Sequence, residues 1–444
     1  MSFTSPFFLF AFLPLTVIVY QLARSTKIRN IVWIVSGLLF YAFGDVRHLP
    51  LLLGSCLLHY GAGRYLMART KARRAVLLLC VALDLAVLAF YKIRGALPLG
   101  ISFYTFQAIS YVADTYKNPA DGTKNLREAL QYLTFFPQLT AGPFLKFSAL
   151  RPALDRRDGS WEKNAQGARR FVCGLCKKVL LSTAAGKLAD AMFSLTAIDA
   201  LGAWTGALSY CLQLYFDFSG YSDMALGLGL LFGVQLPENF RYPYCAGSVS
   251  EFWRRWHMTL SGWFRDYVYI PLGGSRKKMA RTVFHKLIVF LATGLWHGTG
   301  WTFVLWGLWH GVFCGAETLL DRKHTRKAHW YGHVYTLLVV IFGFVLFRAE
   351  SVPQALMLLR AMLSGFTPVD ACRLALRNLL TAGTVFWCFA GVLACLPLRE
   401  HAKARFGGSR WLLPALDALT IVGLLLCLMQ LASHSFQPFI YASF

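Results

Sequence analysis

The chain has 444 residues, of which 56% are hydrophobic and only 15% are charged, and its mean hydropathy is +0.48. A soluble domain is nearer half apolar and a quarter charged, so this composition excludes an ordinary soluble domain. The net charge of +24 does not indicate nucleic-acid binding, because the basic residues lie in short clusters between apolar runs.

Apolar runs that could enter a membrane occur along the whole chain. They cover residues 7–22, 32–43, 75–90, 284–295, 301–313, 334–347, 385–396 and 411–431. A straight span needs roughly 20 residues, so the shorter runs must tilt, extend into semi-polar flanks, or lie within the protein. We predict an all-α polytopic membrane protein with roughly ten to twelve membrane-embedded helices, forming one multi-spanning domain over residues 1–444.

Basic clusters between the apolar runs predict the orientation of the chain. They are Arg24/Lys27/Arg29, Arg69/Lys71/Arg73/Arg74, Arg276/Lys277/Lys278/Arg281 and Arg322/Lys323/Arg326/Lys327. Cytoplasmic loops carry an excess of Lys and Arg. No basic residue precedes the first run, so we expect the N-terminus outside and the first two clusters in the cytoplasm. The first run has neither a cationic start nor a cleavage site, so we expect it to be retained in the protein.

Two semi-polar stretches early in the chain are too polar for lipid and too apolar for a solvated loop. Residues 98–107 begin with Pro and Gly, and residues 133–147 contain Pro137, Gly142 and Pro143, which break a helix. Both stretches predict re-entrant or cavity-lining segments. Residues 151–170 are the most polar part of the chain and predict a surface loop that leads into a helix.

Carboxylates and an aromatic stripe mark the middle of the chain. Asp217 and Asp223 lie among apolar neighbours, where a carboxylate is costly unless it is paired. They form a structural polar network that holds helices together, or else Asp217 or Asp223 supports a catalytic histidine. Residues 251–269 place their aromatic side chains on one stripe, which predicts an amphipathic helix at the membrane interface with His257 at the edge of the stripe.

Two copies of a Trp-His-Gly motif follow, at His297 and at His310. An imidazole in so apolar a segment needs a polar partner or a wet cavity, which favours a functional role. On one unbroken helix the two histidines would point to different sides, and we expect Gly298 and Gly300 to break the helix between them. The scattered cysteines, mostly in apolar runs, predict buried thiols, and Cys173 and Cys176 are interpreted as two small apolar residues on a helix, without a second ligand pair for a metal.

The ordered motifs resemble the membrane-bound O-acyltransferases, most closely the bacterial alginate O-acetyltransferases and the D-alanyl transfer proteins of teichoic acid. They include residues 135–138 (FFPQ), 217–223 (DFSGYSD), 252–257 (FWRRWH), 270–274 (IPLGG) and 295–298 (LWHG). The resemblance covers nearly the whole chain and implies a ring of helices in which a funnel and a tunnel meet at a histidine. It places the catalytic core at about residues 98–321.

The resemblance also implies roles for particular residues. His297 would be the general base or form a transient acyl-imidazole, with His310 as its rival, and His257 would orient the acceptor or polarise the acyl group. Substrate contacts are expected from Trp296 at the donor and from Asn239, Gln138 and Asp217 as polar lining.

The resemblance further implies the substrates. The donor would be an acyl thioester, acetyl-CoA, which approaches from the cytoplasm and is a substrate, with no bound cofactor. The acceptor would be a hydroxyl outside the bacterial inner membrane, on an extracytoplasmic acetyl-carrying partner protein or on a polysaccharide such as alginate. Two alternatives stay open. One is D-alanyl or other acyl transfer from a carrier-protein thioester, and the other is a proton-coupled transporter.

Overall fold

The computed structural model describes residues 1–68, 71–157, 159–321, 329–407, 409–433 and 439–440, and these residues form helices and connecting segments without a strand. An all-α polytopic membrane protein is thus confirmed. Five segments are long and apolar enough to cross a membrane, or six if the bent pair of α18 (Asp370–Leu379) and α19 (Ala382–Ala394) counts as one span. The larger number of embedded helices predicted above includes shorter helices, and it stays a prediction.

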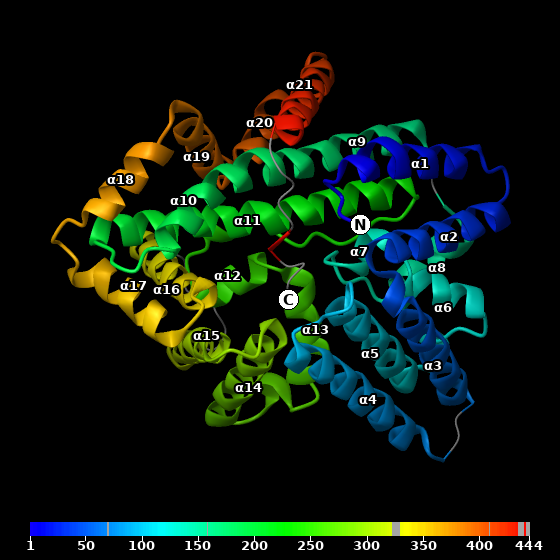
Figure 1. Ribbon diagram of the computed structural model, residues 1–444. Helices are drawn as coiled ribbons and strands as arrows, with labels where there is room; N and C mark the ends of the chain where they lie inside the picture. The colour runs from blue at the N-terminus through cyan, green and yellow to red at the C-terminus, as the bar shows by residue number, and fades with distance from the viewer. Residues whose placement is uncertain (69–70, 158, 322–328, 408, 434–438, 441–444) are drawn as a thin grey trace. The chain divides into compact units, whose positions relative to one another are not determined.

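The chain divides into two compact units (Figure 1). Unit 1 comprises Met1–Leu175, Tyr221–Glu238 and Leu431–Phe444, and unit 2 comprises Cys176–Gly220 and Asn239–Gln430. The basic cluster at residues 322–327 and Arg69 lie outside the described residues. Each of the eight apolar runs overlaps a helix in one of the two units.

Unit 1 contains the first nine α-helices. They are α1 (Leu13–Leu22), α2 (Thr26–Asp45), α3 (Leu49–Met67), α4 (Arg73–Arg94), α5 (Ile101–Lys117), α6 (Leu126–Leu133), α7 (Phe136–Leu139), α8 (Phe147–Asp155) and α9 (Trp161–Cys176). Helix α5 packs beside α3 and α4, and nearly all of its side chains are buried. Residues 101–107, expected as part of a re-entrant segment, therefore belong to a continuous buried helix. Residues 133–147 are broken around the short helix α7, as the prolines predict.

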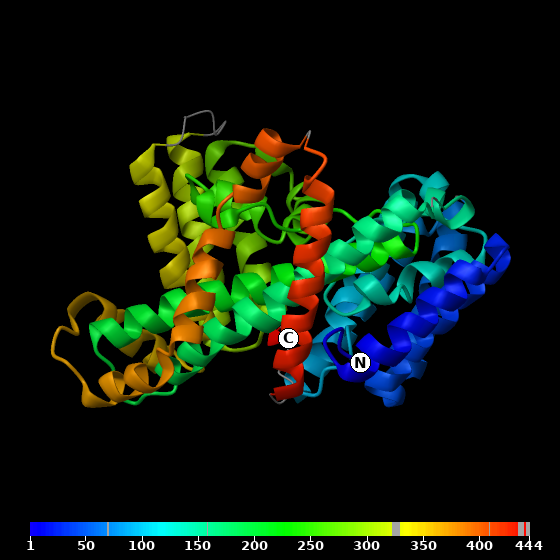
Figure 2. The same ribbon diagram turned by 90° about the horizontal axis from the view of Figure 1, so that it is seen from above.

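Unit 2 contains the remaining helices and most of α11. They are α10 (Thr183–Phe193), α11 (Ala200–Leu231), α12 (Val249–Arg255), α13 (Met258–Phe264), α14 (Met279–His297), α15 (Trp301–Leu320), α16 (Trp330–Arg348), α17 (Val352–Ser364), α18, α19, α20 (Leu398–Phe406) and α21 (Leu412–Ser433). The yellow helices α15 and α16 run side by side (Figure 2).

The predicted single amphipathic helix over residues 251–269 is wrong. Helix α12 ends at Arg255, α13 begins at Met258, and residues 265–269 continue as a π-helix. The break lies at His257, whose φ of 44° is in the left-handed region. That conformation costs a non-glycine residue roughly 1–2 kcal/mol, so surrounding contacts must hold it in place.

Helices α14 and α15 form a close antiparallel pair, because two glycines let the backbones approach. A Cβ on Gly294 would lie 2.4 Å from the carbonyl oxygen of Phe303, and one on Gly307 would lie 2.5 Å from the carbonyl oxygen of Phe290. Small residues allow this kind of approach between membrane helices. The expected break at Gly298 and Gly300 is confirmed, since α14 ends at His297 and α15 begins at Trp301.

Replacing Gly307 by alanine should push α14 and α15 apart and destabilise unit 2. Overpacking of this kind costs about 1–3 kcal/mol, and the shift would also displace His297 at the end of α14. Thermal unfolding of purified protein in detergent measures the loss. Gly300→Ala is the matched control, because its Cβ would have no neighbour closer than 3.7 Å. Equal melting temperatures for the two variants would contradict the close approach.

Candidate active site

His297 is buried in an aromatic enclosure at the C-terminal end of α14. Its ring centroid lies 4.8 Å from that of Trp296, 5.2 Å from Trp306 of α15 and 5.0 Å from Phe347 of α16. The imidazole is only 3% exposed. Three helices of unit 2 thus surround the predicted catalytic base with rings that keep bulk water away from it.

Asn239 holds His257 in the break between α12 and α13. The side-chain oxygen of Asn239 accepts hydrogen bonds from the backbone N–H of Thr259 at 3.2 Å and from its hydroxyl at 2.9 Å. The same oxygen lies 3.2 Å from Nδ1 of His257. Since that oxygen can only accept, Nδ1 carries a proton and donates it. In the neutral ring, Nε2 of His257 therefore carries the lone pair.

Burial favours the neutral form of the His257 imidazole. It lies outside the helices that could cross a membrane, yet it is 2% exposed, and burial lowers its pKa to about 3. The ring of Phe218 packs edge-on against it at 4.5 Å. A neutral imidazole of such low basicity is suited to accept a hydrogen bond from a hydroxyl, and poorly suited to remove its proton.

Trp296 contacts both histidines. Its ring centroid lies 6.5 Å from that of His257 and 4.8 Å from that of His297. The structure thus brings together four of the residues predicted from sequence: the two histidines, Trp296 and Asn239. They come from α14, from the break after α12 and from the segment before α12, all within unit 2.

Trp306 contacts both His297 and His310, with its ring centroid 5.2 Å from that of His297 and 5.3 Å from that of His310. The Nδ1 of His310 accepts a hydrogen bond from the indole N–H of Trp253 at 3.3 Å. The Nε2 side faces Gly343 closely, since a Cβ there would lie 2.5 Å from that nitrogen. The Nε2 of His310 is buried without a hydrogen-bond partner among the described residues, so its role as a rival to His297 stays a prediction.

Asp217 forms a buried ion pair with Lys178 in the π-helix Lys177–Ser182. Asp223 pairs in the same way with Arg170, at 2.6 Å within unit 1. Both pairs support the interpretation of these carboxylates as a structural network, and a contact of Asp217 with substrate stays a prediction. Gln138 belongs to unit 1, where its amide donates to the carbonyl of Tyr132 at 3.0 Å.

Sequence reasoning missed two residues that shape this site. Lys178 follows Lys177 within an otherwise apolar run and is the buried one of the two, a signal that could have been matched to Asp217. Glu317 at the end of α15 accepts hydrogen bonds from the backbone N–H groups of Val249 and Ser250, at 2.6 and 2.8 Å. A carboxylate at a helix N-terminus is stabilising, and this one fixes the start of α12 and hence the approach to His257.

The chain is similar in sequence to known proteins. The family model for membrane-bound O-acyltransferases matches residues 117–359, more than half of the chain. The probable alginate O-acetylase AlgI of Pseudomonas putida is 35% identical over 100% of both chains. The peptidoglycan O-acetyltransferase of Helicobacter pylori is 35% identical over 84% of this chain and 81% of its own.

A more distant relative is the teichoic acid D-alanyltransferase of Bacillus subtilis, which is 27% identical over 57% of this chain and 69% of its own. The resemblance expected from the motifs is therefore confirmed, and the transporter alternative receives no support. The chain belongs to the membrane-bound O-acyltransferase family and is an O-acyltransferase.

Proposed function

We propose that this protein moves an acetyl group from acetyl-CoA to a hydroxyl on the outer side of the bacterial inner membrane. The acceptor would be an exopolysaccharide such as alginate, reached directly or through an acetyl-carrying partner protein. The observation that carries the proposal is the pair of buried histidines joined by Trp296. The names of the relatives at 35% identity, which are O-acetylases of extracytoplasmic polymers, support the acyl group and the acceptor class.

The proposed mechanism assigns a different task to each histidine. The reacting hydroxyl donates its one hydrogen bond to His297, which takes the proton, while a neighbouring hydroxyl of the acceptor donates to Nε2 of His257 and so orients the acceptor. The reacting oxygen then attacks the thioester carbonyl, the C–S bond breaks, and the proton on His297 passes to the leaving thiolate. The rings of Trp296, Trp306 and Phe347 exclude the water that would otherwise hydrolyse the thioester.

The positive-inside pattern supports the direction of transfer. With Arg24, Lys27 and Arg29 in the cytoplasm and the N-terminus outside, the basic loops would attract the phosphates of the donor on the cytoplasmic side. The second candidate is D-alanyl transfer from a carrier-protein thioester. It has weaker support, because the D-alanyltransferase of Bacillus subtilis shares less identity over a smaller share of the chain.

The test uses purified protein in nanodiscs with acetyl-CoA labelled in the acetyl group. Oligomers of alginate are supplied as acceptor, alone or with periplasmic extract. We expect release of free CoA together with label on the polysaccharide or on a protein in the extract. If acetyl-CoA is neither consumed nor bound while a D-alanyl carrier-protein thioester is consumed, the second candidate replaces the first.

A further inference from the structure

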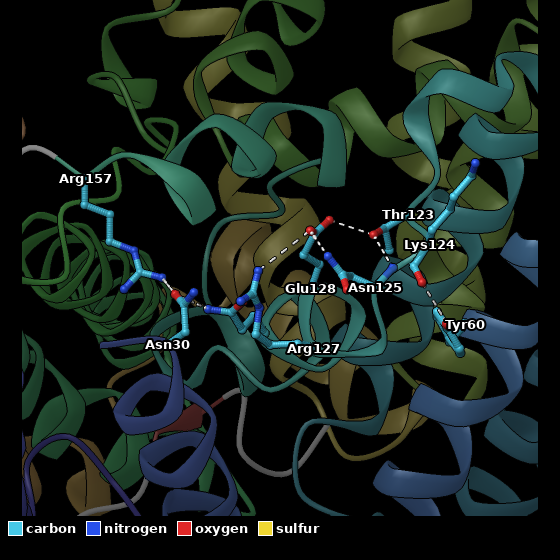
Figure 3. A network of polar contacts seen from close by, with 9 residues as sticks. Asn30, Tyr60, Thr123, Lys124, Asn125, Arg127, Glu128 and Arg157 are labelled. Carbon is cyan, nitrogen blue, oxygen red and sulfur yellow. Dashed lines mark hydrogen bonds and ion pairs between the residues drawn. The ribbon is translucent and has the colours of Figure 1, made fainter. Parts of the chain in front are cut away.

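Three arginines from distant parts of unit 1 lie near enough that the charges of two of them act on the third, Arg157. They are Arg29 in α2, Arg127 in α6 and Arg157 just after α8. The guanidinium carbons of Arg29 and Arg157 each lie 5.7 Å from the ring centroid of Tyr20. Arg157 points toward Asn30, and Arg127 points toward Glu128 (Figure 3). We call these three residues the arginine cluster.

Arg157 is the anchored member of the arginine cluster. It donates hydrogen bonds to the carbonyl of Ala153 and to the hydroxyl of Tyr20, both at 2.9 Å, and to the side-chain oxygen of Asn30. Its guanidinium also lies 4.8 Å from the ring of Trp33. These contacts fix the position of one planar cation at the centre of the cluster.

Arg29 and Arg127 keep donors available for a ligand. Among the described residues, Arg29 donates through its Nε to the carbonyl of Ala23 at 3.0 Å, and its two terminal amino groups have no acceptor there. The Nε of Arg127 is buried and has no hydrogen-bond partner among the described residues. A buried donor of this kind is costly unless a ligand or water accepts from it.

The positive charge of the cluster is not balanced by the residues around it. Within the described part of the chain, one carboxylate pairs with the cluster, that of Glu128, at 4.0 Å from Arg127. That carboxylate already accepts hydrogen bonds from Thr123 at 2.6 Å and Asn125 at 2.9 Å. Burial lowers the pKa of Arg157, as do the like charges of Arg29 and Arg127, while Tyr20 opposes the shift. A bound anion would relieve this repulsion.

We propose that the arginine cluster binds the phosphate group of a phosphate ester. Guanidinium groups match phosphate oxygens in bidentate geometry, and three of them suit a doubly or singly charged phosphate. Exposed apolar side chains lie close to Arg29 in the sequence, at Leu22, Ile28 and Ile31. They are available to contact acyl chains. The phosphate could come from an anionic phospholipid or from a soluble coenzyme, and the inference does not depend on the proposed acyl donor.

The experiment measures thermal unfolding of the purified full chain in a neutral detergent while a probe is added. The probes are phosphatidylglycerol, phosphatidylcholine as the zwitterionic reference, coenzyme A and inorganic pyrophosphate. The test variant is Arg29→Gln with Arg127→Gln. The matched control is Arg24→Gln with Lys27→Gln, which removes the same charge from two exposed residues at the start of the same region.

We expect phosphatidylglycerol to stabilise the wild type and the control, while the test variant needs roughly tenfold more lipid for the same shift. The same pattern with coenzyme A or pyrophosphate in place of the lipid would support the site with a soluble ligand. Equal responses of the test variant and the wild type to every probe would overturn the proposal. It would also be overturned if phosphatidylcholine shifted the melting temperature of the wild type as much as phosphatidylglycerol does.

A folding defect is separated from a binding defect by a second variant. Arg29→Lys with Arg127→Lys keeps the charge but loses the bidentate geometry, so its response to the probe should lie between those of the wild type and the glutamine variant. If the test variant does not fold, Arg29→Gln alone gives the answer, because Arg29 is only partly buried and is not the anchor of the cluster. A full response of this single variant to every probe would also overturn the proposal.

Discussion

Alanine at His297 should lower the rate of acyl transfer by roughly 10²–10⁴-fold, which is the range for loss of a general base. The protein should still fold, since the change removes one ring from an enclosure whose other walls belong to α14, α15 and α16. The measurement is the initial rate of thioester consumption with acceptor present, compared with the wild type in the same nanodiscs. His297→Gln, which preserves more of the side-chain volume, should be nearly as inactive.

The second Trp-His-Gly copy supplies the control for this prediction. His310→Ala removes the same group from a position of similar burial, at 0% exposure against 3% for His297. It should lower the melting temperature through lost packing against Trp253 and Trp306, yet keep most of the transfer rate in protein that remains folded. Activity that survives in His297→Ala and disappears in His310→Ala would reverse the assignment of the two histidines.

Asp217→Asn should destabilise unit 2 by about 3–5 kcal/mol, the usual cost of leaving one partner of a buried ion pair without its counter-charge. Asp217 is 0% exposed and Lys178 is 6% exposed, so water cannot replace the lost carboxylate. The change is measured as a loss of melting temperature in detergent. A double replacement, Lys178→Met with Asp217→Leu, should regain most of the loss, because it removes both buried charges.

Asp190→Asn is the matched control for this ion pair. Asp190 pairs with Arg348 at 2.9 Å in the same unit, but its side chain is 52% exposed. Exposed pairs contribute about 0–1 kcal/mol, so the control should melt close to the wild type. If both asparagine variants melt alike, the pair of Lys178 and Asp217 is not the strong constraint on α11 that its burial indicates.

The parts of the site that sequence could predict are those with a local chemical signal. A histidine within an apolar segment is unusual, and this predicted a functional role for His297. The glycines that follow it predicted the end of α14. Asn239 was expected as polar lining only from the resemblance of the motifs to the family. The apolar helices could also be located, because a long run of Leu, Val and Phe in a membrane can form few structures other than a helix.

The parts that sequence could not predict depend on contacts between distant residues. Nothing around Trp256 and His257 signals a break, since neither glycine nor proline is present and the aromatic period continues across it. The break exists because Asn239, 18 residues earlier, holds the backbone and the ring of His257 together. The capping of α12 by Glu317 is likewise invisible locally, because it joins residues 68 positions apart.

The left-handed backbone of His257 bears on how its position should vary among relatives. Glycine and asparagine adopt that conformation at lower cost than histidine, so a position selected for its backbone alone would drift toward them. Imidazole chemistry would select against that drift and keep the costlier residue. The residues that relatives carry at this position therefore distinguish two roles. Frequent glycine would indicate a hinge, and a retained histidine would indicate a chemical role.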